Sequence, residues 1–316
     1  MSGDVSSIPL VAAQRHAGIQ AITVADFLKR PIPPRALILD PVLPEQGLAM
    51  LFAQRGIGKT HVALSMGYAI ASGGSFLRWR APRPRQVLFV DGEMPASAMQ
   101  ARIAAIVAGA AQQPPDPKYF RLITPDLLPI DVAIPNIAKR AGQEMIDGAM
   151  EDADVLILDN LSALARGLRE NEADDWFPIQ EWLLSLRRAG KSVVIIHHAG
   201  RAGSPRGTSK REDVLDTMIS LRRPDGYSSE EGARFIVELT KARGVHGLEA
   251  RPFEARLETI DGAAKWTARD IEDEQEARVM TLSEDGMSVR EIATETGIPK
   301  STVHRIVRRA ALESAR

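Results

Sequence analysis

The sequence predicts an α/β protein: a doubly wound, mostly parallel sheet, followed by a small all-α domain at the C-terminal end. Short continuous apolar runs alternate with longer amphipathic stretches, as they do when helices connect strands that are buried on both faces. Near the C-terminal end the apolar spacing becomes helical. The expected strands lie at 48–52, 87–90, 155–158, 192–196, 217–221 and 235–239.

The length of the chain suggests how many domains it forms. At ~150 residues per domain, 316 residues fit two domains, or one large domain with an appendage. We expect an N-terminal arm or linker at 1–46, an α/β core at 47–262 and the helical domain at 270–316. Prolines at 31, 33 and 34 exclude a long helix there, so the end of the arm is expected to be extended.

Composition excludes several classes of protein. The chain has no cysteine, which excludes disulfides, thiol catalysis and thiolate metal sites. It has neither an apolar run near the ~18 residues of a membrane span nor a basic-then-apolar leader, so we expect a cytoplasmic protein with no membrane partner. Because the formal net charge is only -1, any contact with DNA must come from local patches.

The most specific signal is a glycine-bearing segment between an expected strand and an expected helix. Gly56 and Gly58 let backbone N–H groups curl around a phosphate. Lys59 can reach the β- and γ-phosphates of ATP, and the Thr60 hydroxyl can bind Mg²⁺. Ala53 departs from the usual pattern, which begins with glycine, and a plain glycine turn is the alternative. The predicted nucleotide-binding residues here are Ala53, Gln54, Arg55, Gly56, Ile57, Gly58, Lys59, Thr60 and His61.

Acidic residues follow two other apolar runs. In a doubly wound sheet, functional groups collect beyond the carboxyl ends of the strands, so these residues should converge. Asp159 is expected to hold Mg²⁺ opposite Thr60, and a strand-end aspartate that caps the next turn is the alternative. Glu93 is the expected base that polarises the attacking water, with Asp91 as a competitor or a supporting partner.

Two histidines and a basic loop follow the fourth run. His197 or His198 would lie near the γ-phosphate and sense it, and a buried structural histidine is the alternative. The segment after them is small, flexible and basic, so we expect it to contact a polyanion; a solvated surface loop is the alternative. Its candidate DNA-binding residues are Arg201, Lys210 and Arg211.

The last predicted core strand ends in two cations, Lys241 and Arg243. Residues two apart on a strand point to the same side of it. Nucleotide hydrolases of this type often lack one cation for the transition state, and a neighbouring subunit can supply it. The pattern therefore predicts an oligomer, and an ordinary exposed strand end is the alternative.

Together these elements resemble the RecA-like core of hexameric helicases, and most closely the RepA-type helicases of plasmids. The resemblance covers about residues 30–260. It rests on the segment 56–60, Glu93, Asp159, His197-His198-Ala199, Arg206-Gly207-Thr208-Ser209 and Lys241-Ala242-Arg243. It implies a ring of six subunits, with ATP and Mg²⁺ at the interfaces and single-stranded DNA in the central channel. The departures are Ala53 and the C-terminal tail.

The resemblance also implies roles for particular residues. The catalytic candidates are Lys59, Glu93, His198, Arg206 and Arg243. Arg206 matches the arginine that such rings place in the neighbour's site, whereas Lys241 and Arg243 resemble the Lys-x-Arg finger of the related DnaB helicases. We favour Arg206 as the main finger and Arg243 as the second. Arg102 resembles a family arginine near the nucleotide.

The tail carries the spacing of a helix-turn-helix. Ala293 lets two helices cross closely, Gly297 takes the left-handed turn, and Val303 and Ile306 fix the second helix to the core. A first supporting helix is expected at 276–282. The motif resembles the resolvase and transposase type, which implies contact with duplex DNA; a helical-hairpin interaction module is the alternative. The candidate DNA-binding residues are Lys300, Ser301, Thr302, His304 and Arg305.

These patterns lead to one functional prediction and two alternatives. We expect an ATP-dependent DNA helicase or translocase of the RepA type, acting in plasmid or mobile-element replication. The alternatives are an ATP-switched DNA-binding regulator and a filament-forming recombination ATPase of the RecA or RadA type. Glu93 favours a motor over a switch, because a switch has no need of a catalytic base. The sequence leaves both ring and filament open.

Overall fold

The computed structural model describes residues 21–167, 174–200 and 211–314, which fall into two units, 1–34 and 35–316. The described part of the first unit, 21–34, contains a short helix, α1 (Val24–Leu28), whose N-cap Thr23 accepts a hydrogen bond from the Asp26 backbone N–H. The proline-bearing residues after it have no regular secondary structure, as predicted. The hairpin of β1 (Leu37–Leu39) and β2 (Leu43–Pro44) lies in the second unit, although the predicted arm extended to residue 46.

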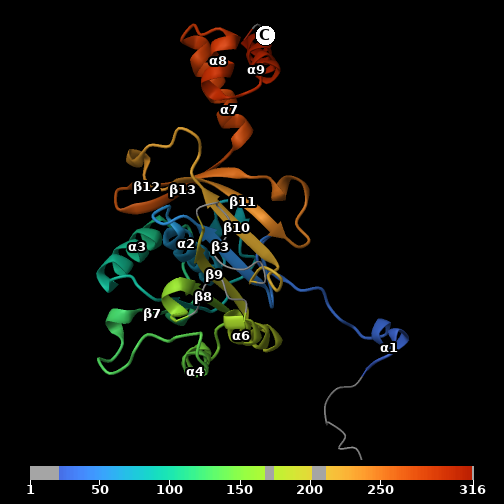
Figure 1. Ribbon diagram of the computed structural model, residues 1–316, viewed down its shortest axis with the longest axis vertical. Coiled ribbons are helices and arrows are strands. Elements are labelled where there is room, and N and C mark those ends of the chain that lie inside the picture. The colour runs from blue at the N-terminus through green and yellow to red at the C-terminus, as the bar shows by residue number, and fades with distance from the viewer. Residues whose placement is uncertain (1–20, 168–173, 201–210, 315–316) are drawn as a thin grey trace, which may run out of the picture. The chain divides into compact units, whose positions relative to one another are not determined.

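The second unit contains a nine-stranded sheet with the strand order β13-β12-β11-β10-β3-β9-β8-β6-β7 (Figure 1). The six strands from β10 to β7 are parallel, and β11, β12 and β13 add to one side as antiparallel neighbours. The predicted α/β fold class with a mostly parallel sheet is therefore confirmed. The predicted strands correspond to β3 (Leu48–Ala53), β6 (Val87–Asp91), β8 (Val155–Asp159), β9 (Ser192–His198), β10 (Thr217–Arg222) and β11 (Arg234–Ala242).

Helices cover both faces of the sheet, because alternate side chains of each strand point to opposite sides. Leu51 of β3 packs in the core beneath α2 and α3, whereas its neighbour Met50 packs in the core beneath α4, α5 and α6. Both residues are fully buried, which explains why the strands are continuously apolar. The helices are α2 (Lys59–Ser72), α3 (Ala96–Gly109), α4 (Arg140–Met150), α5 (Leu161–Leu164) and α6 (Phe177–Arg188).

Three strands of the sheet were absent from the sequence prediction. They are β7 (Phe120–Ile123), β12 (Phe253–Ile260) and β13 (Ala263–Asp270). β7 lies at the edge of the sheet and none of its four residues is fully buried, so it lacks a long apolar run. The β12–β13 hairpin turns at Asp261 and Gly262, both with positive φ, and the sheet therefore continues past the expected core boundary at residue 262.

The remaining short elements connect the layers. A second hairpin consists of β4 (Ser75–Phe76) and β5 (Trp79–Arg80). The described 3-10 helices are η1 (Pro117–Tyr119), η2 (Pro125–Leu127), η3 (Asp174–Trp176), η5 (Ser229–Glu231) and η6 (Gly247–Ala250). No helix among the described residues is long and apolar enough to cross a membrane.

Three helices at the C-terminal end confirm the predicted helix-turn-helix: α7 (Ile271–Glu284), α8 (Val289–Thr296) and α9 (Lys300–Ser314). Ser288 and Glu291 form a capping box at the start of α8, and Gly297 ends it in the left-handed conformation, with φ +69°. Val303 and Ile306 are buried in a small core of their own with residues of α7 and α8. The expected supporting helix at 276–282 lies within α7.

Candidate functional site

The carboxyl ends of the parallel strands meet at a cavity of about 800 Å³. Parallel strands end at the same edge of a sheet, and residues at or just after the ends of β3, β6, β8, β9 and β10 all contribute to its wall. Residues 100 positions apart, such as Lys59 and Asp159, therefore line one pocket. The predicted residues among its lining are Gly56, Ile57, Gly58, Lys59, Thr60, His61, Glu93, Arg102, Asp159 and His198.

The turn after β3 has the geometry of a phosphate loop. Gly58 has φ +112°, a conformation that L side chains rarely adopt, and α2 begins at the next residue. The Lys59 ammonium donates hydrogen bonds to the carbonyl oxygens of Ala53 at 3.0 Å and Gln54 at 2.8 Å. Ala53 is the last residue of β3, with a negative φ, so its methyl group causes no strain there. Arg55 is exposed and does not line the pocket.

Burial is the largest cause of the pKa shifts of Lys59 and Asp159 in the pocket. Burial lowers the pKa of Lys59 to about 8, and the neighbouring carboxylates of Asp159 and Glu93 partly oppose this shift. Burial also raises the pKa of Asp159 to about 7, and a hydrogen bond with the Thr60 side chain opposes the rise. The desolvated charges of the pocket therefore have little solvent to screen them, which strengthens their interaction with any bound anion or cation.

Asp91 and Asp159 lie side by side, at paired positions of β6 and β8. Burial raises the pKa of Asp91 to about 6. Its Oδ2 accepts hydrogen bonds from the backbone N–H groups of Glu93 at 3.2 Å and Met94 at 2.7 Å, which fixes the turn that carries Glu93. Oδ1 of Asp91 and Oδ2 of Asp159 are buried and have no hydrogen-bond partner among the residues that the structure describes.

Those carboxylate oxygens and the Thr60 hydroxyl fit a Mg²⁺ ion, which prefers oxygen ligands. The described residues contain no cluster of three or more histidine, aspartate or glutamate side chains that could hold a metal alone. This agrees with the chemistry of Mg²⁺, which usually binds one or two carboxylates and completes its shell with water and phosphate oxygens. Lys59 and the N-terminal end of α2 fit the phosphates themselves.

The two histidines at the end of β9 face opposite sides, because neighbouring strand residues alternate. His198 is 7% exposed and lines the pocket. His197 lies on the other side, where its Nε2 is 3.1 Å from Nη1 of Arg211. The structure therefore favours His198 over His197 as the residue that can contact the nucleotide.

Arg211 differs from the expectation that it lies in an exposed DNA-binding loop. It is only 3% exposed, and its guanidinium lies 5.3 Å from the centre of the Trp176 ring. A buried cation packed on an aromatic ring and a histidine is part of the core, and it does not face a polyanion. Arg201, Arg206 and Lys210 lie outside the described residues.

Lys241 and Arg243 are remote from this pocket. β11 runs antiparallel to β10, so its C-terminal end lies beside the start of β10, at the opposite edge of the sheet. There Lys241 donates a hydrogen bond to the carbonyl oxygen of Glu212. Arg243 donates to the carbonyl oxygen of Asp213 at 3.1 Å and lies 3.8 Å from Asp216. Neither residue lines the nucleotide pocket of its own chain.

The loop between β10 and β11 supplies residues that the sequence prediction missed. Arg223 and Tyr227 line the pocket, with the Arg223 guanidinium 3.7 Å from the centre of the Tyr227 ring. The Tyr227 hydroxyl donates to the carbonyl oxygen of Gly232 at 2.9 Å. Because β10 is parallel to β3, the rule about strand ends applies to it too, and that rule could have found both residues.

His61 and Arg102 complete the wall on the α2 and α3 side. Burial, and then the charge of Arg102, lower the pKa of His61 to about 4. The imidazole is therefore neutral near pH 7 and can act as a hydrogen-bond donor or acceptor toward a ligand.

Comparison with known proteins agrees with this geometry. The family model of the AAA domain matches residues 13–204, well over half of the chain. The chain belongs to the AAA domain family. A second model, of the homeodomain-like domain, matches residues 270–314 of this AAA-domain protein, the segment that forms α7, α8 and α9. Among curated proteins, none matches its sequence.

One of two similar solved structures shares the fold of this chain. A KaiC-like protein from the hyperthermophilic archaeon Pyrococcus horikoshii OT3 is 15% identical, with a TM-score of 0.51 over 72% of this chain and 93% of that one. The flagellar accessory protein FlaH from Methanocaldococcus jannaschii is 14% identical, with a TM-score of 0.48 over 71% of this chain and 91% of that one. The family match and the pocket make the chain a P-loop ATPase with a C-terminal helix-turn-helix domain.

Proposed function

We propose that this chain is an ATP-dependent DNA translocase or helicase of the RepA type. It hydrolyses ATP at the interfaces of a ring of six subunits and moves along single-stranded DNA in the central channel. The observation that supports this most is the meeting of Lys59, Glu93, Asp159 and His198 in one pocket at the edge of the sheet. A catalytic carboxylate beside the phosphate loop fits turnover of the nucleotide better than its mere retention.

Each group in the pocket has a task that its chemistry suits. The backbone of the phosphate loop and the Lys59 ammonium hold the phosphates of ATP, and Thr60 and Asp159 hold Mg²⁺. Bound Mg²⁺ neutralises charge on the phosphates. The Glu93 carboxylate accepts the hydrogen bond of the attacking water and polarises it, while Asp91 positions Glu93 through the backbone of its turn. His198 contacts the γ-phosphate.

We propose that the pocket takes a further cation from a neighbouring subunit. Among the described residues, its lining arginines are Arg102 and Arg223, and the second of these is hydrogen-bonded to backbone carbonyls. Lys241 and Arg243, at the opposite edge of the sheet, can serve only a different subunit's pocket. We assign Arg206 as the main finger in the neighbour's site, with Arg243 as the second.

The helix-turn-helix adds recognition of duplex DNA. Val303 and Ile306 turn one face of α9 into the core, and Lys300, His304 and Arg305 are exposed on the rest of it. Cationic and hydrogen-bonding side chains on such a helix suit phosphates and base edges in a major groove. This domain would place the motor at a plasmid or mobile-element origin.

The experiment measures the ATPase rate with and without single-stranded DNA, together with the mass of the protein in solution with ATP and Mg²⁺. Stimulation by DNA and a six-subunit mass are the expected results, and Lys59→Ala should abolish hydrolysis. Arg206→Ala should lose hydrolysis but still bind ATP, and mixing it with Lys59→Ala subunits should restore part of the rate. No recovery in the mixture would exclude Arg206 as a finger acting on the neighbour.

The helix-turn-helix itself favours a second candidate, an ATP-switched regulator that binds an operator. A slow hydrolysis rate that DNA does not change, from a monomer or dimer, would select that function instead. A recombination ATPase of the RecA or RadA type would give DNA-stimulated hydrolysis from open filaments of variable mass.

A further inference from the structure

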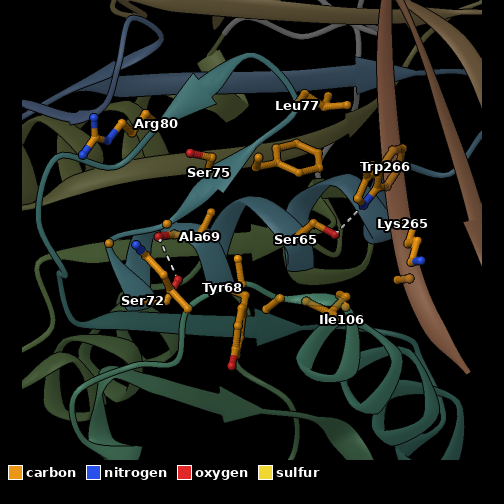
Figure 2. A pocket seen from close by; sticks show the side chains of 18 of the residues that line it. Ser65, Tyr68, Ala69, Ser72, Ser75, Leu77, Arg80, Ile106, Lys265 and Trp266 are labelled. Carbon is orange, nitrogen blue, oxygen red and sulfur yellow. Dashed lines mark hydrogen bonds between the residues drawn. The ribbon is translucent and has the colours of Figure 1, made fainter.

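A second cavity lies at the C-terminal end of α2 (Figure 2). The phosphate loop lies at the N-terminal end of the same helix. Its volume is about 730 Å³, and small-molecule sites commonly occupy ~300–1,000 Å³. The walls come from the second half of α2, the β4–β5 hairpin, the residues after α3, and β13. Among the described residues, none lines both this cavity and the nucleotide pocket.

Apolar side chains make up much of the wall: Tyr68, Phe76, Leu77, Ile106 and Trp266. The polar groups of Tyr68 and Trp266 are both hydrogen-bonded within the protein. Trp266 Nε1 donates to Ser65 Oγ at 3.0 Å, and the Tyr68 hydroxyl donates to Gln113. What these two side chains offer a ligand is therefore the carbon surface of their rings.

Small residues keep the space open. Gly109 lets the end of α3 approach β13 so closely that a Cβ there would lie 2.1 Å from the carbonyl oxygen of Ala264. Ala69 of α2 and Ala110 after α3 are too short to fill the space between the walls. The close backbone packing that Gly109 allows therefore shapes the cavity.

The polar groups at the cavity are mostly uncharged. Ser72 and Ser75 line it with hydroxyl groups, and Ser72 uses its donor on the carbonyl oxygen of Ala69 at 3.3 Å, which leaves its oxygen as an acceptor. The charged lining residues are Arg80 and Lys265; both are exposed, and in Figure 2 their charged ends point away from the aromatic side chains. A charged ligand would therefore lose hydration without gaining a partner.

We propose that this cavity is a binding site for a small, uncharged aromatic molecule. The ligand would place its ring against Phe76 and Trp266 and donate a hydrogen bond to the hydroxyl oxygen of Ser72 or Ser75. The site is independent of the nucleotide pocket, so it does not depend on the function proposed above.

The test uses N-phenyl-1-naphthylamine, a neutral aromatic probe whose fluorescence rises in apolar surroundings, with the full-length chain in the presence of ATP and Mg²⁺. We expect the probe to bind and ATP not to displace it. Ser75→Phe, an exposed position on the rim, and Ala110→Phe, inside the wall, should each weaken probe binding about tenfold. Ala104→Phe, on the exposed side of α3, is the matched control and should leave binding unchanged.

Three results would overturn the proposal. The first is the absence of any fluorescence rise, or equal binding by the two cavity variants and the control. The second is displacement of the probe by ATP, which would place the probe in the nucleotide pocket. The third is a probe signal per chain that falls as the protein associates at higher concentration, which would assign the cavity to a second copy of the chain. Circular dichroism checks that each variant is folded.

Discussion

The Arg223 guanidinium donates a hydrogen bond from Nη2 to the carbonyl oxygen of Gly56 at 3.1 Å, and so ties the β10–β11 loop to the phosphate loop. Its Nη1 donates to the carbonyl oxygens of Gly232 and Arg234, at 3.0 Å each, and the same group stacks on the Tyr227 ring. A planar guanidinium can meet all these partners at once, whereas a lysine ammonium cannot. Two segments distant in sequence are thereby held as one wall of the pocket.

Removing this connection should weaken nucleotide binding more than it slows the chemical step. We expect Arg223→Ala to raise KM for ATP about tenfold, with a smaller fall in kcat, because the β10–β11 loop is then no longer held against the phosphate loop. Arg222→Ala is the matched control, since Arg222 is exposed and its nearest acidic partner, Glu238, is 3.8 Å away. Steady-state kinetics of the two variants checks this, and equal KM values would contradict it.

The buried Asp159 should make the stability of the nucleotide-free protein depend on pH. Its pKa is about 7 when folded, above the ordinary aspartate value of 3.8, so folding favours the protonated form and stability falls as pH rises from about 4 through 7. Asp159→Asn removes this cost, and we expect it to raise Tm at pH 8 by at least about 2 °C but hardly at pH 4. Thermal unfolding at both pH values measures this.

The same substitution should abolish the stabilisation that Mg²⁺ and ATP together give the wild-type protein. The Tm of the nucleotide-free protein reports the loss of the buried charge, whereas the stabilisation by Mg²⁺ and ATP reports the loss of a Mg²⁺ ligand. A variant no more stable than wild type at pH 8 would show that solvent reaches Asp159 and that its pKa is not raised.

Two glycines at helical positions should respond oppositely to alanine. Gly109→Ala would drive a Cβ into the carbonyl oxygen of Ala264, so the end of α3 must separate from β13, and we expect a loss of about 2 kcal/mol or more in the free energy of unfolding. Gly148→Ala, within α4, meets nothing within 4 Å and should stabilise the protein by about 0.5 kcal/mol. Chemical denaturation compares the two; a stable Gly109→Ala protein would mean that α3 and β13 are not in close contact.

The exposed face of α9 should contribute to binding of duplex DNA through phosphate contacts. We expect Arg305→Ala to weaken binding and to reduce the slope of log K against log salt by about 1, the loss of one ion contact. Lys118→Ala removes an exposed cation from η1 of the core and serves as the control. Fluorescence anisotropy over a range of salt concentrations measures both. An unchanged slope for Arg305→Ala would favour a protein-interaction role for the helix-turn-helix.

Local sequence determined much of this protein. The continuous apolar runs gave six strands of the sheet because both of its faces are covered, and the phosphate loop was evident because Gly56, Gly58 and Lys59 lie within four residues. The spacing of Gly297, Val303 and Ile306 likewise predicted the turn and core of the tail, since a helix repeats every ~3.6 residues. The prediction that Asp159 and Glu93 lie at the same edge of the sheet did not require the strand order, because both residues follow strands that were expected to be parallel.

Only the tertiary structure decided the rest. β12 and β13 alternate polar and apolar residues and lack the continuous apolar runs of the other strands, so the sequence did not show that they join the main sheet. Because β11 runs antiparallel to β10, Lys241 and Arg243 lie far from the pocket. Arg211, which was expected in an exposed loop, is buried beside His197. Strand direction and burial depend on which segments pair across the whole chain, and the side chains nearby in sequence do not encode that pairing.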